Sequence, residues 1–282
     1  PQGARTDLQP SANLPKVSQP EAATMLNVSE RSIRAVKAIE QAAPELLQKI
    51  AAGTMTVGAA EKEVRAQVRK EERRAMAAAF AELQPTDRWH VAVADMRTYN
   101  PGGQFDFIIT DPPYPREYLP LYEVLAERAK EWLKPGGLLI AMCGQSYLDQ
   151  IYASMSKHLT YYWTSCYLTP GQPTGLRHKQ VNTSWKPLLV YAVDGNYRGK
   201  TFGDVYTSPD PEKGGHEWQQ SVEGMLAIMR QVCLPGQSIF DPFLGAGTTG
   251  VAALKHGCIF HGIDVDEQSV NLSKGRLAEV HD

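Results

Sequence analysis

Most of the chain, from about Arg88 onward, alternates short apolar runs with segments of helical pattern. The apolar runs predict strands at Trp89–Ala94, Phe105–Thr110, Leu138–Cys143, Tyr161–Leu168, Pro187–Val193, Ser238–Asp241 and Cys258–Asp264. Helical patterns lie between most of them, at Leu121–Leu133, Leu148–His158, Val222–Cys233 and Thr248–His256. Strands that alternate with helices in this way are typical of a doubly wound α/β sheet, which is the fold class that we expect.

The tetrapeptide Asp111-Pro112-Pro113-Tyr114 directly follows the second of these strands. It gathers a carboxylate, a rigid backbone and an aromatic ring, because each proline fixes its own φ and restricts the residue before it. An exocyclic amine on an extruded nucleobase needs acceptors for its hydrogens and a flat surface on which its ring can stack. The alternative is an ordinary strand-terminating turn, since Asp-Pro-Pro is also good turn chemistry.

A glycine-rich turn, Asp241-Pro242-Phe243-Leu244-Gly245-Ala246-Gly247-Thr248-Thr249-Gly250, follows a later strand and opens a helix. Glycines let the backbone approach a ligand closely, and a helix N-terminus offers unpaired N–H groups. Asp264 ends the next strand, where an acid can bind ribose hydroxyls. Taken alone, this spacing would suit a nicotinamide-dependent oxidoreductase equally well.

Together the two motifs resemble the amino-methyltransferases that act on DNA. Phe243 before the first glycine is like their Phe-x-Gly-x-Gly pattern, and the tetrapeptide precedes the glycine-rich turn, as in their permuted β class. The resemblance implies a Rossmann-like methyltransferase sheet of seven strands with permuted motif order. It also implies S-adenosylmethionine as the cofactor, double-stranded DNA as the substrate, and no metal.

The same resemblance implies roles for individual residues around the cofactor. Asp95 would meet its adenine and Asp264 its ribose, beside the turn formed by Asp241, Phe243, Gly245 and Gly247. Thr248 and Thr249 carry hydroxyls that can meet the methionine carboxylate. The segment His216–Ser221 stands where the family commonly has His-Pro-x-Gln-Lys-Pro; His216 and Gln219 match, whereas Gln220 replaces Lys and Ser221 replaces Pro. Gln219 is therefore a candidate contact, and His216 is equally well a structural histidine.

The catalytic residues implied are Asp111, Pro112, Pro113 and Tyr114. The amine is a weak nucleophile, because its lone pair is delocalised into the base. The Asp111 carboxylate and the Pro112 carbonyl would accept its two hydrogens, and Tyr114 would stack on the base. Asp111 need not be a strong base, since the proton becomes acidic once nitrogen carries the methyl and alignment supplies much of the rate. In this family an Asp at the first position is typical of adenine N6 enzymes and Ser of cytosine N4 enzymes. We therefore expect adenine, with cytosine N4 as the alternative.

The N-terminal part has a different pattern, all helical. Residues 1–15 read as a linker or tail, residues 16–60 as a helix-turn-helix module, residues 61–85 as a charged connecting helix and residues 86–282 as the methyltransferase domain. Ser18 and Ser29 are expected to cap its two helices, with Asn27 in the turn between them. Its second helix and trailing sequence resemble the module of ParB-type partition proteins, so Arg31 and Arg34 are candidate DNA contacts. A helical packing or dimerisation module is the alternative.

The expected target-recognition segment, about residues 165–215, is irregular and basic. Six of its side chains are of types that bind base edges or phosphates: Arg177, Lys179, Gln180, Asn182, Arg198 and Lys200. The alternative for these residues is a solvated surface, and Trp185 fits either a base pocket or the core. Because the segment is short, the helix-turn-helix module or a second subunit of a homodimer would share in recognition.

Bulk composition limits the remaining function classes. The formal net charge of −2 predicts no strong overall attraction to DNA, so contacts depend on local patches. The four cysteines lack metal-ligand spacing, which indicates reduced thiols and a cytoplasmic, prokaryotic or phage-encoded protein that associates with the nucleoid. No apolar run approaches the roughly 20 residues of a membrane helix. A DNA-binding regulator with a decayed methyltransferase domain remains an alternative, although the intact motifs oppose it.

Overall fold

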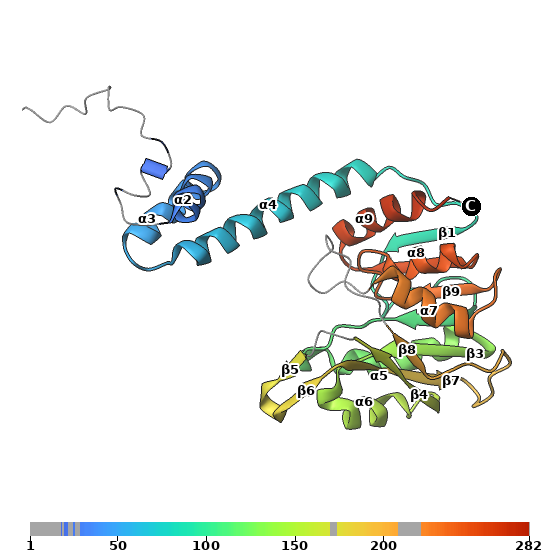
Figure 1. Cartoon of the computed structure of the whole chain (residues 1–282). Helices are drawn as coiled ribbons and strands as arrows, with labels where there is room; N and C mark the ends of the chain where they lie inside the picture. The colour runs from blue at the N-terminus through green and yellow to red at the C-terminus, as the bar shows by residue number, and fades with distance from the viewer. Residues whose placement is uncertain are drawn as a thin grey trace, which may run out of the picture. The chain divides into compact units, whose positions relative to one another are not determined.

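The computed structural model describes residues 18, 20–21, 25, 29–169, 174–207 and 221–281. The chain divides into two units, Pro1–Glu72 and Arg73–Asp282, and the boundary between them falls inside helix α4 (Figure 1). Each unit is described by itself below.

The N-terminal unit is helical in its described part, with α2 (Glu30–Ala42), α3 (Pro44–Ala51) and the start of α4 (Val57–Phe80). Ser29 caps α2 as expected, because its hydroxyl accepts a hydrogen bond from the Ser32 N–H at 3.1 Å. Ser18 and Glu21 exchange hydrogen bonds in the manner of a capping box, which agrees with a helix beginning there. The Asn27 turn lies outside the described residues.

A small core holds the helices of this unit together. Its buried members are Ile39, Ala43, Leu46 and Ala60. Arg31 and Arg34 lie on the exposed side of α2. Helix α4 begins four residues before the expected connecting helix, because the Thr56 hydroxyl accepts from the Ala59 N–H at 3.2 Å and starts the helix there.

The second unit contains one sheet of eight strands in the order β1-β10-β9-β2-β3-β7-β4-β8. The strands are β1 (Trp89–Val93), β2 (Phe105–Thr110), β3 (Leu133–Met142), β4 (Thr160–Leu168), β7 (Trp185–Ala192), β8 (Val205–Thr207), β9 (Ser238–Asp241) and β10 (Ile259–Asp264). The first five in sheet order are mutually parallel, and β7 runs antiparallel to both of its neighbours. A separate hairpin pairs β5 (Thr174–Leu176) with β6 (Val181–Thr183).

The expected mixed α/β class is therefore correct, whereas the count of seven strands is wrong by one. The additional strand is β8, whose three residues are too few to show a period in the sequence. Strand β3 also begins at Leu133, five residues before the expected start. Gly137 explains the earlier pairing, because a Cβ there would lie 2.5 Å from the Asp106 carbonyl oxygen, so only glycine lets β2 and β3 approach this closely.

Helices cover both faces of the sheet (Figure 1). Helices α5 (Pro120–Trp132) and α6 (Leu148–Met155) bury Tyr122, Leu125 and Ile151 against one face. Helices α7 (Val222–Val232), α8 (Thr248–Lys255) and α9 (Glu267–Ala278) bury Met225 and Ile228 among others against the other face. Three short 3-10 turns complete the described elements, η1 (Arg116–Tyr118), η2 (Gln145–Tyr147) and η3 (Arg177–Lys179). Within the described residues, no helix is long and apolar enough to cross a membrane.

Candidate active site at the carboxyl ends of the strands

Four carboxylates gather at one edge of the sheet. Asp95 follows β1, Asp264 ends β10, Asp241 ends β9 and Asp111 follows β2. Because these strands are parallel neighbours, their carboxyl ends meet at the same edge, so the structure brings together four acids that the sequence separates widely. From β9 the chain winds outward through α8 to β10, and from β2 it winds the opposite way through α5 to β3. The crevice between β9 and β2 is thus a topological switch point, where open α/β sheets bind their ligands.

The glycine-rich turn closes over Asp264. The Gly245 N–H donates to Oδ2 of Asp264 at 2.8 Å, and Gly245 itself has a φ of 50°. Gly247, at the start of α8, has a φ of 77°, and a Cβ there would lie 2.7 Å from Cβ of Ser273 on α9. Both positions therefore require glycine, the first for conformation and the second also for close packing.

Asp95 and Asp264 present oxygen acceptors at the neighbouring ends of β1 and β10. Arg97 holds Asp95, with Nη2 at 2.5 Å from Oδ2 and Nε at 2.9 Å from Oδ1. These hydrogen bonds from Arg97 lower the pKa of the Asp95 carboxyl below its usual range and keep it ionised. The main-chain N–H of Asp266 donates to Oδ1 of Asp264 at 3.0 Å. Two oriented carboxylates at adjacent strand ends suit the hydroxyl and amine donors of a nucleoside.

The two threonines of the turn are buried, and their hydroxyls already have protein partners. Thr248 accepts from Nη1 of Arg276 at 3.2 Å, and the same nitrogen donates to the Ala246 carbonyl at 2.6 Å. The Thr249 hydroxyl bonds to Asp241. Arg276 belongs to α9 and no motif in the sequence marked it, although it braces the turn from the following helix.

Asp241 links the glycine-rich turn to the catalytic turn. Its side chain is only 2% exposed, and its Oδ1 accepts from the Thr110 hydroxyl at 2.7 Å and from the Phe243 N–H at 3.0 Å. Burial raises the pKa of Asp241 to about 6, against the opposing effect of these donors, and the charge of nearby Asp111 adds to the rise. Thr110, which the sequence did not single out, is fully buried and immediately precedes Asp111.

In the catalytic turn, the Tyr114 hydroxyl donates a short hydrogen bond to Oδ1 of Asp111. Burial, with the adjacent Asp111 charge, raises the pKa of Tyr114 well above its ordinary value, so the phenol remains a donor. Pro112 is buried and Pro113 is half-buried. Behind the turn, burial raises the pKa of the Cys143 thiol to about 12, which leaves it neutral and unsuited to act as a nucleophile.

The basic residues expected to bind DNA fall into two groups. Arg177, Lys179, Gln180 and Asn182 are exposed on the β5–β6 hairpin, which connects the end of β4 to the start of β7 at the same edge as Asp111. The half-buried Trp185 begins β7 there.

Arg198 and Lys200 lie at the opposite edge, because the antiparallel β7 carries the chain away from the acids. The Arg198 N–H donates to the Gly136 carbonyl near the start of β3, at 3.2 Å, and the Lys200 ammonium donates to the Arg230 carbonyl at the end of α7, at 2.6 Å. The structure therefore does not group these two residues with the other candidates. Gln219 and His216, together with Pro170–Pro173 of the recognition segment, lie outside the described residues.

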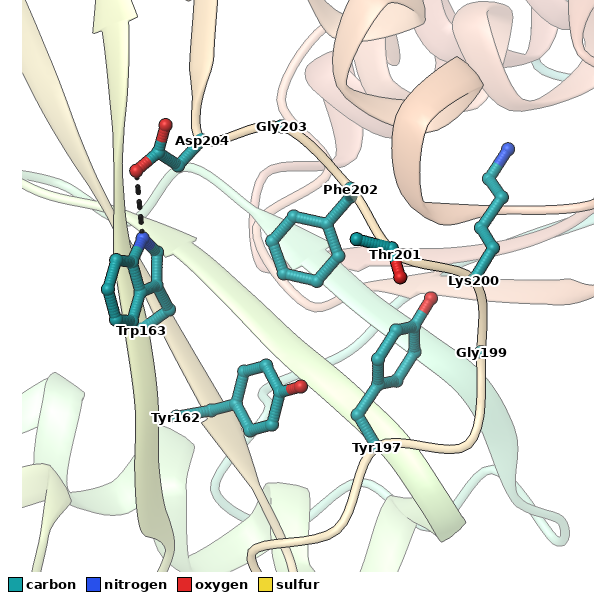
Figure 2. Close-up of a pocket in the computed structure, with 9 residues that line it drawn as sticks. All are labelled: Tyr162, Trp163, Tyr197, Gly199, Lys200, Thr201, Phe202, Gly203 and Asp204. Atoms are coloured by element: carbon teal, nitrogen blue, oxygen red, sulfur yellow. Dashed lines mark hydrogen bonds between the residues drawn. The ribbon is translucent and has the colours of Figure 1, made fainter.

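A hollow of about 770 Å³ lies along the outer strand β4, three strands away from β2. Figure 2 shows Tyr162 and Trp163 on one side of it and Tyr197 and Phe202 on the other, with the Trp163 indole N–H donating to Asp204 at 3.1 Å. None of the four carboxylates lines it. We therefore place the candidate active site at the carboxyl edge and not in this hollow.

Several known proteins are similar to the chain. YubD of Escherichia coli K12, which carries a provisional methylase name, is 26% identical over 202 residues, 64% of this chain and 85% of YubD. The type II methyltransferase M.HpaI of Haemophilus parainfluenzae is 23% identical over 212 residues, 61% of this chain and 68% of that protein.

Solved structures share the fold. The crystal structure of M1.HpyAVI superposes with a TM-score of 0.55 at 21% identity, covering 67% of this chain and 98% of that one. The cytosine-N4-specific PvuII DNA methyltransferase superposes with a TM-score of 0.58 at 12% identity, covering 68% and 87%.

The prediction of S-adenosylmethionine as the cofactor is confirmed, because the family and the S-adenosylmethionine complexes of M1.HpyAVI and TTHA0409 support it. The DNA methylase family matches residues 105–275, which include both the catalytic turn and the glycine-rich turn. The chain belongs to the DNA methylase family.

Proposed function

We propose that this methylase transfers the methyl group of S-adenosylmethionine to the N6 amine of an adenine extruded from double-stranded DNA. The observation that carries the proposal is the position of Asp111 at the end of β2, across the switch point from the glycine-rich turn at the end of β9. A methyl donor on that turn and an amine at Asp111 would meet in the crevice between the two strands.

The residues at the crevice fit the cofactor. Asp264 and Asp95 offer ionisable acceptors for its ribose hydroxyls and adenine amine, and the positive-φ backbone at Gly245 and Gly247 allows close approach. The N-terminus of α8, with Gln219 as a further contact, is assigned to the methionine carboxylate. Because both turn threonines are held by protein groups, we assign them to bracing the turn as much as to touching the cofactor. When bound, S-adenosylmethionine supplies a methyl group on a positively charged sulfur.

The catalytic turn handles the amine. Asp111 accepts one amine hydrogen and the Pro112 carbonyl the other, which draws the nitrogen lone pair out of conjugation with the ring. The Tyr114 hydroxyl occupies one acceptor position of Asp111, and a carboxylate can accept about four hydrogen bonds, so the amine can share it. The Tyr114 ring supplies the stacking surface, and Asp111 takes the proton after the methyl has been transferred.

Adenine is the favoured base because Asp, the residue typical of adenine N6 enzymes, stands at the first position of the tetrapeptide. Cytosine N4 is the second candidate. It is favoured by the fold shared with the cytosine-N4-specific PvuII enzyme, although at 12% identity that likeness concerns the fold alone.

DNA would be contacted from two places. The exposed side chains of the β5–β6 hairpin stand at the catalytic edge, where they can reach bases or phosphates around the target. Arg31 and Arg34 on α2 provide a second candidate surface in the helix-turn-helix module. Arg198 and Lys200, at the far edge, would reach DNA only on another subunit's share of the duplex, which fits the proposed homodimer.

The test is to incubate the protein with unmethylated plasmid and S-adenosylmethionine, digest the DNA to nucleosides and quantify methylated bases by mass spectrometry. N6-methyladenine is expected from the parent, none from Asp111→Ala, and parental amounts from Asp149→Ala, an exposed acid on α6. N4-methylcytosine as the product would overturn the choice of base. Product from Asp111→Ala would overturn the assigned mechanism.

A further inference from the structure

Lys186 reaches from a neighbouring strand onto the ring of the catalytic tyrosine. It is the second residue of β7, and the Cys143 N–H donates to the Pro187 carbonyl at 3.2 Å, so β7 continues alongside the segment that follows β3. A Cβ on Gly144 in that segment would lie 3.4 Å from Cβ of Tyr114. The Lys186 ammonium lies 5.2 Å from the centroid of the Tyr114 ring.

The charge of Lys186 is not neutralised by a carboxylate. Among the residues that the structure describes, it contacts the Tyr114 ring and forms no ion pair, although it is half-buried. Other lysines of this unit differ, because Lys134 pairs with Asp106 at 2.8 Å and Lys157 with Glu123 at 2.9 Å. A partly desolvated ammonium is only partly stabilised by a cation–π contact. It is therefore prepared for an anion that arrives with a ligand.

The anion that fits this position is a phosphodiester and not the cofactor carboxylate. The glycine-rich turn begins at the end of β9, and β7 is three strands away from β9, or about 14 Å at the usual strand spacing. Tyr114, by contrast, is in direct reach, and the β5–β6 hairpin ends at Thr183, three residues before Lys186. Lys186 thus stands between the candidate recognition hairpin and the ring on which the base would stack.

We propose that Lys186 binds a phosphodiester adjacent to the extruded target nucleotide and so holds that nucleotide against Tyr114. The inference rests on the proposed function, since it needs a base at Asp111. It adds a substrate-positioning residue that lies outside both sequence motifs.

The test uses the intact protein and a duplex that contains one target site, mapped beforehand from the methylated plasmid. The variants are Lys186→Met, which keeps the aliphatic stem, and Lys186→Arg, which keeps the charge. Lys255→Met, at the exposed end of α8 on the opposite edge, is the matched control. Duplex affinity is measured against salt, and again with one methylphosphonate placed at each phosphate flanking the target base.

Lys186→Met is expected to lower the slope of log affinity against log salt by about 0.9, the value of one lost phosphate contact. The parent should lose affinity severalfold at one methylphosphonate position, and Lys186→Met should be insensitive to that substitution. Lys186→Arg and the control should behave like the parent, and cofactor affinity should be unchanged in all of them.

An unchanged slope and retained methylphosphonate sensitivity in Lys186→Met would overturn the proposal, as would weaker cofactor binding with normal duplex binding. A parent protein that forms no methylated base would overturn the proposed function as well. The two failures are distinguishable, because the second appears before any variant is made.

Discussion

Replacing Thr110 with valine tests the link between the cofactor turn and the catalytic turn. Valine keeps the shape and the β-branch of threonine but removes the hydroxyl that donates to Asp241 at 2.7 Å. Thr110 is 0% exposed and Asp241 2% exposed, so water cannot replace the lost donor. A hydrogen bond to a charged group contributes about 1.5–3 kcal/mol. We expect the free energy of unfolding at neutral pH to fall by about that amount.

The loss should depend on pH in a defined direction. The folded-state pKa of Asp241 is raised to about 6, above its unfolded value, so the folded state binds the extra proton between the two values. Stability from this group is therefore fully present below the unfolded pKa and declines as pH rises through about 6. Removing the Thr110 donor penalises mainly the ionised form, so the difference between parent and variant should be largest above pH 6 and shrink below it.

Chemical denaturation at several pH values, followed by tryptophan fluorescence, measures this difference. Thr110→Ser is the control, because it restores the hydroxyl and should recover most of the stability and of the methyl-transfer rate. A Thr110→Val defect that is the same at pH 5 and pH 8, or that Thr110→Ser shares in full, would refute the hydrogen-bond explanation and point to packing alone.

Two further predictions concern the cofactor side of the site. Gly247→Ala places a Cβ 2.7 Å from that of Ser273 at a φ of 77°, so it should cost about 1–3 kcal/mol of stability and weaken S-adenosylmethionine binding, as measured by thermal unfolding and equilibrium dialysis. A variant with parental stability and affinity would show that the turn tolerates a side chain. Arg97→Gln removes the hydrogen bonds that lower the pKa of Asp95, so cofactor affinity, which needs the ionised acceptor, should be lost at a higher pH than in the parent. An unaltered pH profile in calorimetric titration would remove Asp95 from the cofactor site.

Local patterns predicted the parts of the site that depend on local structure. Strand followed by Asp111-Pro112-Pro113-Tyr114, and strand followed by a glycine-rich turn, are each formed within about ten residues, and the structure places both at strand ends. The Ser29 cap was predictable for the same reason.

Features that depend on strand direction or on distant contacts were not predictable. Arg198 and Arg177 belong to one basic stretch of sequence, yet the antiparallel β7 sends them to opposite edges. Thr110 and Arg276 matter through contacts with segments 131 and 30 residues away, and nothing in their neighbouring sequence marks them.

Strand β1 has one neighbour in the sheet, β10, and His90 and His261 on these two strands are 171 positions apart in the chain. At the usual 5–20 residues per second of protein synthesis, β1 therefore waits about 10–35 s on the ribosome before its partner has been made. Asp95 and Asp264, which flank this late pairing, cannot form a joint site until then. The enzyme should acquire its cofactor only near the completion of the nascent chain, and β1 should be the segment that most needs protection from aggregation before that moment.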